Sequence, residues 1–250
     1  MKIVVFALGR TGLPLSLICA DSGFDVIGID INETLVEQLK EVPSILTFSH
    51  SSTVIKALLK LAKEGFTEKD IYVLESRPLK EGGRTAYSLA NAGFKKVFLG
   101  VDFTIFEFAH LADVAVMGAD MLHENGEILN KIGAATIAKL FHDLGKEIIV
   151  AASMSKICLR GIIEKNHDWH PIIPHRNSKE ITNINHPNLT ILNKYFEIIP
   201  PDYITTLIMD KNIFKKPIGK QLGQFIDSSM LADQINVLRN IWNDVDFTIV

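Results

Sequence analysis

The chain has 250 residues, which is enough to bury a full hydrophobic core in one or two domains. Its hydrophobic share of 47% and charged share of 22% are ordinary for a soluble globular protein, and a net charge of −3 excludes a global basic field that would draw it to nucleic acid or an anionic membrane. Two cysteines, Cys19 and Cys158, exclude a disulfide framework and a cysteine-rich zinc site, so we expect a cytoplasmic protein.

The first predicted elements form a β–α–β unit. Its strands are Ile3–Ala7 and Asp25–Asp30, with a helix at Leu13–Ser22 between them. The apolar run Lys2–Leu8 stops at Gly9, so it predicts neither a signal peptide nor a membrane span. A second helix, capped by Asn32, runs to about Glu41 and is ended by Pro43.

After Pro43, strands alternate with helices. The predicted strands are Ile45–Phe48, Ile71–Glu75, Lys96–Val101, Ala112–Met117 and Glu147–Ala151. The predicted helices are Ser52–Glu64, Gly83–Ala92 and Ala134–Leu144. This alternation predicts an α/β fold with a doubly wound, mainly parallel Rossmann-like sheet and helices on both faces. Apolar residues at helical spacing predict an amphipathic tail over Ile218–Ile241. We expect three segments, residues 1–42, 43–216 and 217–250.

The first predicted turn has the features of a dinucleotide fingerprint. Gly9 would let the backbone approach a pyrophosphate, Gly12 would allow close packing of helix on strand, and Asp30 ends the second strand where an acidic residue holds a ribose hydroxyl. The segment resembles the N-terminus of nucleotide-sugar dehydrogenases of the UDP-glucose and GDP-mannose type, including Gly12-Leu13-Pro14-Leu15 and Gly28-Ile29-Asp30-Ile31-Asn32.

That resemblance stops near Glu41, and the second half of a dinucleotide domain does not follow. The first glycine of the fingerprint is also replaced, by Ala7. We therefore expect weak or absent NAD binding and no cofactor. The alternative is that this unit completes the main sheet or forms an interface.

Four motifs in the middle of the chain carry polar groups at strand ends and helix starts. They are Thr47-Phe48-Ser49-His50-Ser51-Ser52-Thr53-Val54, then Glu75-Ser76-Arg77-Pro78, then Gly118-Ala119-Asp120, and last Asn125-Gly126 with Asn130-Lys131-Ile132-Gly133 opening a helix. Parallel sheets bind ligands at the carboxyl ends of their strands, and free N–H groups at a helix start favour an anion. These groups together predict a pocket for a small polyol phosphate.

In this order the motifs resemble the translation initiation factor 2B alpha/beta/delta subunits and their enzyme relatives, the ribose-1,5-bisphosphate and methylthioribose-1-phosphate isomerases. The patterns are T-x-S-x-S-S-T-V, E-S-R-P-L-x-E-G, G-A-D, N-G-x-x-x-N-K-I-G and V-A-A-x-x-x-K. The run from Asn193 to Ile204 looks like the N-x-x-F-D-x-x-P-P-x-x-I segment of that superfamily. The resemblance covers about Ser44 to Phe214.

The resemblance implies a role for single residues. In the isomerases, a cysteine and an aspartate move a proton between adjacent carbons of an aldose phosphate; the aspartate position is Asp120, and the cysteine position falls on Ser49. A serine hydroxyl is a far weaker acid than a thiol with a pKa of about 8.5. The ligand-binding positions are Ser51, Ser52, Arg77, Asn130, Lys131 and Lys156.

Several functions stay open at this point. The first is a sugar-phosphate-binding protein with a binding or regulatory role. The others are an active aldose–ketose phosphate isomerase using Asp120, a nucleotide-binding protein using Gly9, Gly12 and Asp30, and an interaction module. We expect at least a homodimer or a pairing with a related subunit, a phosphorylated sugar or nucleotide as ligand, and no nucleic acid or membrane partner. We expect no metal site, because His167, His170, His175 and His186 share one loop without an acidic partner.

Overall fold

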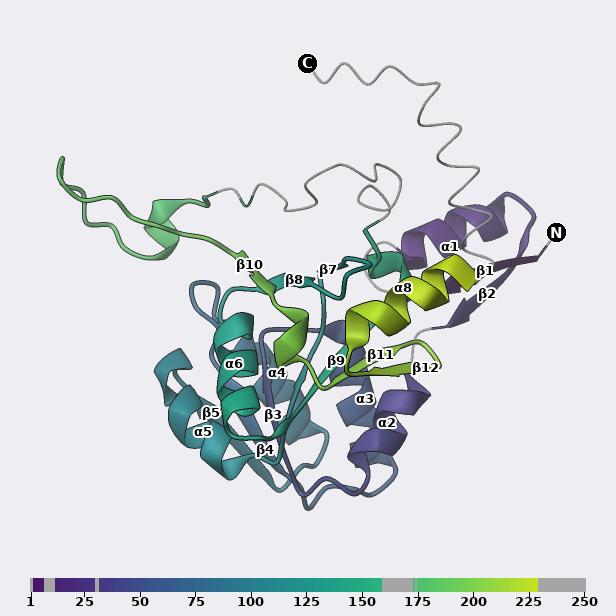
Figure 1. Ribbon diagram of the computed structural model, residues 1–250, viewed down its shortest axis with the longest axis horizontal. Helices are drawn as coiled ribbons and strands as arrows, with labels where there is room; N and C mark the ends of the chain where they lie inside the picture. The colour runs from purple at the N-terminus through teal and green to yellow at the C-terminus, as the bar shows by residue number, and fades with distance from the viewer. Residues whose placement is uncertain (1, 7–11, 30–31, 159–172, 174, 229–250) are drawn as a thin grey trace.

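The computed structural model describes residues 2–6, 12–29, 32–158, 173 and 175–228, and for 2–6, 12–16 and 25–29 it describes the backbone alone (Figure 1). Its centre is a seven-stranded sheet in the order β12-β11-β9-β6-β3-β4-β5. The strands are β3 (Ser44–Phe48), β4 (Asp70–Leu74), β5 (Lys96–Gly100), β6 (Val114–Met117), β9 (Glu147–Ala152), β11 (Thr206–Met209) and β12 (Asn212–Lys215). Neighbours are parallel except β11 and β12, which confirms the predicted doubly wound, mainly parallel sheet.

Helices cover both faces of this sheet because its strands are apolar on both sides. One face packs against α2 (Glu33–Leu39), α3 (Ser52–Lys63) and α4 (Gly82–Asn91), and the other against α5 (Ile105–Leu111), α6 (Ala134–Asp143) and α8 (Ile218–Ser228). Successive strand residues point to opposite faces of the sheet: Ile45 packs in the core on the side of α2, α3 and α4, and Leu46 in the core on the side of α5, α6 and α8. Both side chains are fully buried.

The N-terminal unit forms a sheet of its own. Strands β1 (Lys2–Phe6) and β2 (Asp25–Ile29) pair in parallel, with Lys2 opposite Asp25, and α1 (Gly12–Asp21) connects them. This two-stranded sheet does not join the seven-stranded one, so the alternative that it completes the main sheet is wrong. The following helix α2 does join the main body, because Leu35, Val36 and Leu39 are fully buried beside α3.

A small antiparallel sheet lies beyond the carboxyl ends of the main strands. It consists of β7 (Met121–Leu122), β8 (Ile128–Lys131) and β10 (Phe196–Ile199), in the order β10-β8-β7. The prediction that Asn130 and Lys131 open a helix is wrong, because both lie in β8 and pair with β10. Helix α6 starts later, at Ala134, where the carboxylate of Glu197 accepts the N–H groups of Gly133 and Ala135.

The predicted strands and helices occur within one or two residues of their expected bounds. The exceptions are elements that the sequence pattern did not indicate: α5 with the 3₁₀ turn η1 (Asp102–Thr104) before it, and strands β7, β8, β10, β11 and β12. Short 3₁₀ turns also occur at η2 (Met154–Lys156), η3 (Ser178–Glu180) and η4 (Pro201–Tyr203). Among the described helices, none combines the length and apolar character needed to cross a bilayer.

The described part of the tail packs on its own domain. Ile218, Leu222 and Ile226 of α8 are buried, and the ring of Phe225 lies 5.4 Å from that of Phe214. This part of the apolar stripe is therefore largely covered by the domain itself. The positions beyond Ser228, including Leu231 and Leu238, lie outside the described residues.

Candidate functional site

A cavity of about 300 Å³ opens at the carboxyl ends of β3, β6 and β9. From β3 the chain runs outward through β4 and β5, then returns to β6 on the other side of β3, so β3 and β6 meet at the topological switch point. Seven of the eight predicted catalytic and sugar-phosphate positions line this cavity: Ser49, Ser51, Ser52, Asp120, Asn130, Lys131 and Lys156. The structure thus brings together residues that are far apart in the sequence.

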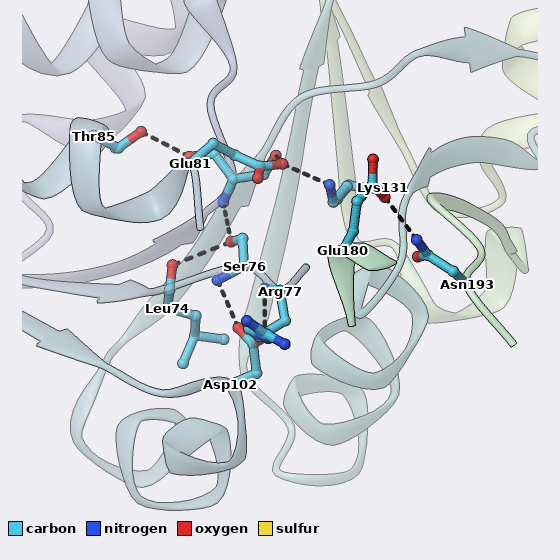
Figure 2. Close-up of polar contacts among 10 residues, drawn as sticks. Leu74, Ser76, Arg77, Glu81, Thr85, Asp102, Lys131, Glu180 and Asn193 are labelled. Carbon is cyan, nitrogen blue, oxygen red and sulfur yellow. Dashed lines mark hydrogen bonds and ion pairs between the residues drawn. The ribbon is translucent and has the colours of Figure 1, made fainter. Parts of the chain in front are cut away.

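Arg77 is the predicted position that does not line the cavity. Its backbone N–H donates to Asp102 Oδ2 at 2.7 Å, and its guanidinium donates to the carbonyl oxygen of Ile181 at 3.4 Å. Figure 2 shows Arg77 beside Asp102 and apart from the contact between Glu81 and Lys131. A role for Arg77 in phosphate binding remains a prediction.

The turn after β3 holds Ser49 in an uncommon backbone conformation. Its φ is +58°, in the left-handed region that few non-glycine residues adopt. The N–H of Ser49 donates to Ser76 Oγ at 2.6 Å, and Thr85 Oγ1 donates to the Ser49 carbonyl at 2.7 Å. These bonds hold the strained turn in place and bring the Ser49 hydroxyl to Glu81, to which it donates at 3.1 Å.

Helix α3 presents its N-terminus to the cavity. Ser51 is the N-cap, and its hydroxyl accepts the N–H of Val54 at 3.4 Å. Ser52 and Thr53 also line the cavity, and the first N–H groups of a helix have no intrahelical acceptor. Gly118 at the end of β6 is needed for this packing, because a Cβ there would overlap the Ser51 hydroxyl. The helix start therefore offers an electropositive wall for an anion.

Lys131 and Glu81, which also line the cavity, form a buried ion pair (Figure 2). The Lys131 ammonium lies 2.7 Å from Glu81 Oε1, and the two side chains are only 7% and 16% exposed. The ammonium also lies 4.6 Å from the centre of the Tyr195 ring. In the described part of the chain, Glu81 Oε2 is buried without a hydrogen-bond partner.

Glu81 and Tyr195 were not among the predicted site residues. Glu81 is the second glutamate of the E-S-R-P-L-x-E-G pattern, so the motif contained the signal, but its importance depends on Lys131 arriving from β8. The hydroxyl of Tyr195 is hydrogen-bonded to Glu180, which raises the pKa of Tyr195 to about 12. Asn193 Nδ2 donates to the same Glu180 carboxylate at 2.7 Å.

Asp120 lies at the end of β6, and burial raises the pKa of its carboxyl above the usual range. Lys156 and Lys131 act against this shift, because each favours the charged form through its positive charge. Asn130 Nδ2 donates to the carbonyl oxygen of Gly118 at 2.9 Å, which joins β8 to the loop that carries Asp120. Ser153 lines the cavity near Lys156.

The cavity therefore combines two ammonium groups, two carboxylates and the start of α3. The ammonium groups and helix N–H groups suit a phosphate, and the carboxylates can accept hydrogen bonds from sugar hydroxyls.

Of the predicted nucleotide positions, Gly9 and Asp30 lie outside the described residues, and Gly12 opens α1. His167 and His170 also lie outside them. Within the described ranges, no three potential metal-binding side chains gather at one place.

Known proteins resemble this chain in sequence. The model of the "Initiation factor 2 subunit family" matches residues 27–216. Ribose 1,5-bisphosphate isomerase of Pyrococcus furiosus is 30% identical over 191 residues, which covers 73% of this chain and 56% of that protein. Methylthioribose-1-phosphate isomerase of Desulforudis audaxviator is 28% identical over 178 residues, covering 68% of this chain and 50% of that protein.

Solved structures resemble it in fold. The crystal structure of 5-methylthioribose 1-phosphate isomerase from Pyrococcus horikoshii has a TM-score of 0.67 and 21% identity, covering 79% of this chain and 59% of that one. Translation initiation factor eIF-2B of the same organism has a TM-score of 0.60 and 24% identity, covering 73% of this chain and 62% of that one. The chain spans about half the length of the curated relatives it matches. With three quarters of its residues matched by the family model, the chain belongs to the initiation factor 2 subunit family, whose relatives include sugar-phosphate isomerases.

Proposed function

We propose that this protein binds a phosphorylated sugar in the cavity at the carboxyl ends of β3, β6 and β9, as a binding or regulatory member of its family. The observation that carries the proposal is the convergence of Lys131, Lys156 and the α3 N-terminus on one cavity that also holds Asp120 and Glu81. The relatives named as isomerases of ribose 1,5-bisphosphate and methylthioribose 1-phosphate support this ligand class. Ser49 stands where the resemblance to the isomerases places their cysteine, and a serine there favours binding over catalysis.

The charges suggest how the ligand lies. The phosphate would sit between the α3 N-terminus and Lys156, because Lys131 is already paired with Glu81. The sugar hydroxyls would then face the carboxylates of Asp120 and Glu81, which accept hydrogen bonds. Arg77 would contribute only after its side chain leaves the carbonyl of Ile181.

Isothermal titration calorimetry tests this proposal. We expect ribose 1,5-bisphosphate or 5-methylthioribose 1-phosphate to bind more tightly than inorganic phosphate. Lys156→Ala should weaken that binding by about 10- to 100-fold, because a hydrogen bond to a charged group contributes about 1.5–3 kcal/mol. Lys95→Ala is the matched control, since Lys95 is 64% exposed and pairs with Glu68 away from the cavity. No binding of either sugar phosphate would refute the proposal.

An isomerase using Asp120 is the second candidate. It is favoured by the raised pKa of the buried Asp120 carboxyl, because a proton-transfer group works best when its pKa lies nearer the working pH. Incubation with the aldose phosphates in D₂O, followed by NMR, would detect deuterium at the carbon next to the carbonyl. Deuterium exchange that occurs in the wild type and disappears in Asp120→Asn would support catalysis. If the wild type shows no exchange, only the binding role is supported.

The N-terminal unit adds a third, narrower expectation. Its likeness to nucleotide-sugar dehydrogenases rests on Gly9, Gly12 and Asp30, and a single β–α–β unit provides half of a dinucleotide site. We therefore propose that NAD binds weakly or not at all. Micromolar NAD affinity that is lost in Asp30→Ala would overturn this and establish a nucleotide site.

We also propose a cytoplasmic location, in keeping with two unpaired cysteines.

A further inference from the structure

The short turn that carries Lys156 is not capped by its own residues. Lys156 ends the 3₁₀ turn η2, and its N–H donates to the carbonyl oxygen of Ser153 at 3.0 Å. Ser153 stands at the N-cap position of this turn, but its hydroxyl is hydrogen-bonded to Ser155 Oγ at 2.6 Å and caps no N–H group. The first N–H groups of the turn therefore need an acceptor from another part of the chain.

Asp210 supplies that acceptor from the neighbouring strand. It follows directly after β11, which pairs in parallel with β9, and η2 follows β9, so the two strand ends lie side by side (Figure 1). Asp210 Oδ2 accepts the N–H of Met154, the first residue of η2, at 3.2 Å. The N–H of Asp210 donates to the carbonyl oxygen of Ala152 at 3.4 Å. Asp210 thus holds the chain on both sides of Ser153.

The tight turn between β11 and β12 explains only part of the choice of residue at this position. The φ of Asp210 is +53°, in the left-handed region that Gly adopts freely and in which Asp and Asn are enriched. Gly, Asn or Asp would therefore serve the turn, but only Asn and Asp carry an acceptor for the Met154 N–H. Burial raises the pKa of the Asp210 carboxyl, and the Met154 N–H lowers it by favouring the charged form. The hydrogen bond thus compensates a carboxyl that has lost part of its hydration.

We propose that Asp210 is a positioning residue for ligand binding, which fixes Lys156 at the cavity by holding the start of η2. The inference rests on the proposed binding of a sugar phosphate, in which Lys156 contacts the phosphate. Asp210 does not line the cavity, so it acts through the turn and not by direct contact with the ligand. The path is short, because the Met154 N–H and the Lys156 ammonium belong to the same three-residue turn.

The placement of Lys156 matters because the other ammonium group of the cavity, that of Lys131, is already paired with Glu81 at 2.7 Å. A lysine ammonium sits on a flexible four-carbon stem, so a fixed backbone reduces the conformational entropy that is lost when it contacts a phosphate. Without the Asp210 carboxylate, the Met154 N–H would lose its acceptor and η2 could shift together with Lys156.

Isothermal titration calorimetry with ribose 1,5-bisphosphate and 5-methylthioribose 1-phosphate tests the proposal. Asp210→Gly keeps the turn but removes the acceptor, and it should weaken binding by about 3- to 10-fold, the range expected for one lost hydrogen bond. Asp210→Asn keeps both and should stay within about 2-fold of wild type. Lys211→Gly is the matched control, because it places a glycine in the same turn at an exposed side chain. Circular dichroism should show all three variants folded.

A double-mutant cycle separates positioning from a general loosening of the cavity. In the Lys156→Ala background, Asp210→Gly should weaken binding by less than about 2-fold, because the group that Asp210 positions is gone. The proposal is overturned if Asp210→Gly leaves wild-type binding unchanged, if it weakens binding equally in the Lys156→Ala background, or if Asp210→Asn weakens binding as much as Asp210→Gly.

The pKa of Asp120 gives a second readout that needs no ligand. Burial raises this pKa, and the positive charges of Lys156 and Lys131 act against the shift. In an NMR titration of the aspartate carboxyl carbons, the pKa of Asp120 should rise in Asp210→Gly, as in Lys156→Ala, and stay unchanged in Asp210→Asn. If the wild type binds neither sugar phosphate, the proposed function fails, and this titration still decides the role of Asp210. An Asp120 pKa that does not move in Asp210→Gly would overturn that role.

Discussion

Removing the Lys131 ammonium should strongly destabilise the fold, because it would leave the Glu81 carboxylate buried and almost without partners. Lys131→Met keeps the length and apolar stem of the side chain, so little packing is lost. Glu81 would keep only the Ser49 hydroxyl as a donor, and its Oε2 already has no partner within the described residues. Breaking a buried ion pair in this way typically costs about 3–5 kcal/mol.

For a chain of this size, a loss of about 3–5 kcal/mol corresponds to a fall in Tm of roughly 6–20 °C. Urea unfolding followed by circular dichroism would measure the free energy, and calorimetry the Tm. Glu81→Gln in the Lys131→Met background removes the unpaired charge, so the double variant should recover much of the loss. Lys95→Met, in the exposed pair with Glu68, should cost less than about 1 kcal/mol.

The double-mutant cycle separates the cost of the unpaired Glu81 charge from the cost of lost packing around Lys131. If Lys131→Met stays within about 1 kcal/mol of wild type, the Glu81–Lys131 pair is not desolvated as its exposed fractions indicate. If the double variant is as unstable as the single one, the loss comes from the packing of Lys131 on Tyr195 and not from the buried charge.

Three further outcomes follow from the site. Asp120→Asn should raise the free energy of unfolding at neutral pH, measured by urea titration, because burial penalises the charge of Asp120. The pKa of Asp120 is higher in the folded chain than its ordinary value of 3.8, so this gain in stability should shrink as the pH falls through the folded pKa towards 3.8. An unchanged gain at low pH would contradict this. Ser49→Cys should increase deuterium exchange into an aldose phosphate by about 100-fold or more, because a thiol can take part in proton transfer, and an unchanged NMR rate would count against the cavity as a catalytic site. Gly118→Ala should displace Ser51, which would cost about 1 kcal/mol of stability through the lost α3 cap and weaken sugar-phosphate binding in calorimetry. Gly83→Ala is the control, because a Cβ there meets open space, and it should change neither stability nor binding in this way. Equal effects of the two substitutions would refute this account.

The fold could be predicted because its signals are local. A buried parallel strand such as β3 is a continuous apolar run, and α3 follows it with an N-cap serine and an amphipathic face, so each element can be recognised within about a dozen residues. Strand β8 could not be recognised in this way. Its partner β10 comes more than sixty positions later, and the pairing with Glu197 and Phe196 determines that Asn130 and Lys131 are extended.

The lining of the cavity could be predicted where a residue's place depends on its own strand end, as for Ser49 and Asp120. It was missed where the place depends on a partner from another element. Glu81 is the N-cap residue of α4 and becomes part of the site because Lys131 reaches it from β8. Arg77 shows the converse: its residue type suits a phosphate, but contacts with Asp102 and Ile181 direct it elsewhere.

Asp102 ties the open edge of the sheet to the cavity. Its two carboxylate oxygens accept the N–H groups of Ser76 and Arg77, each at 2.7 Å, and Ser76 Oγ in turn accepts the N–H of Ser49 (Figure 2). Phe103, whose side chain is 95% exposed, is the next residue along the chain, so two hydrogen-bonded steps connect the neighbour of this exposed residue to the Ser49 turn at the cavity. Loss of the Asp102 carboxylate would therefore leave the N–H groups of Ser76 and Arg77 without their acceptor and loosen the support of the Ser49 turn, although Asp102 itself does not line the cavity.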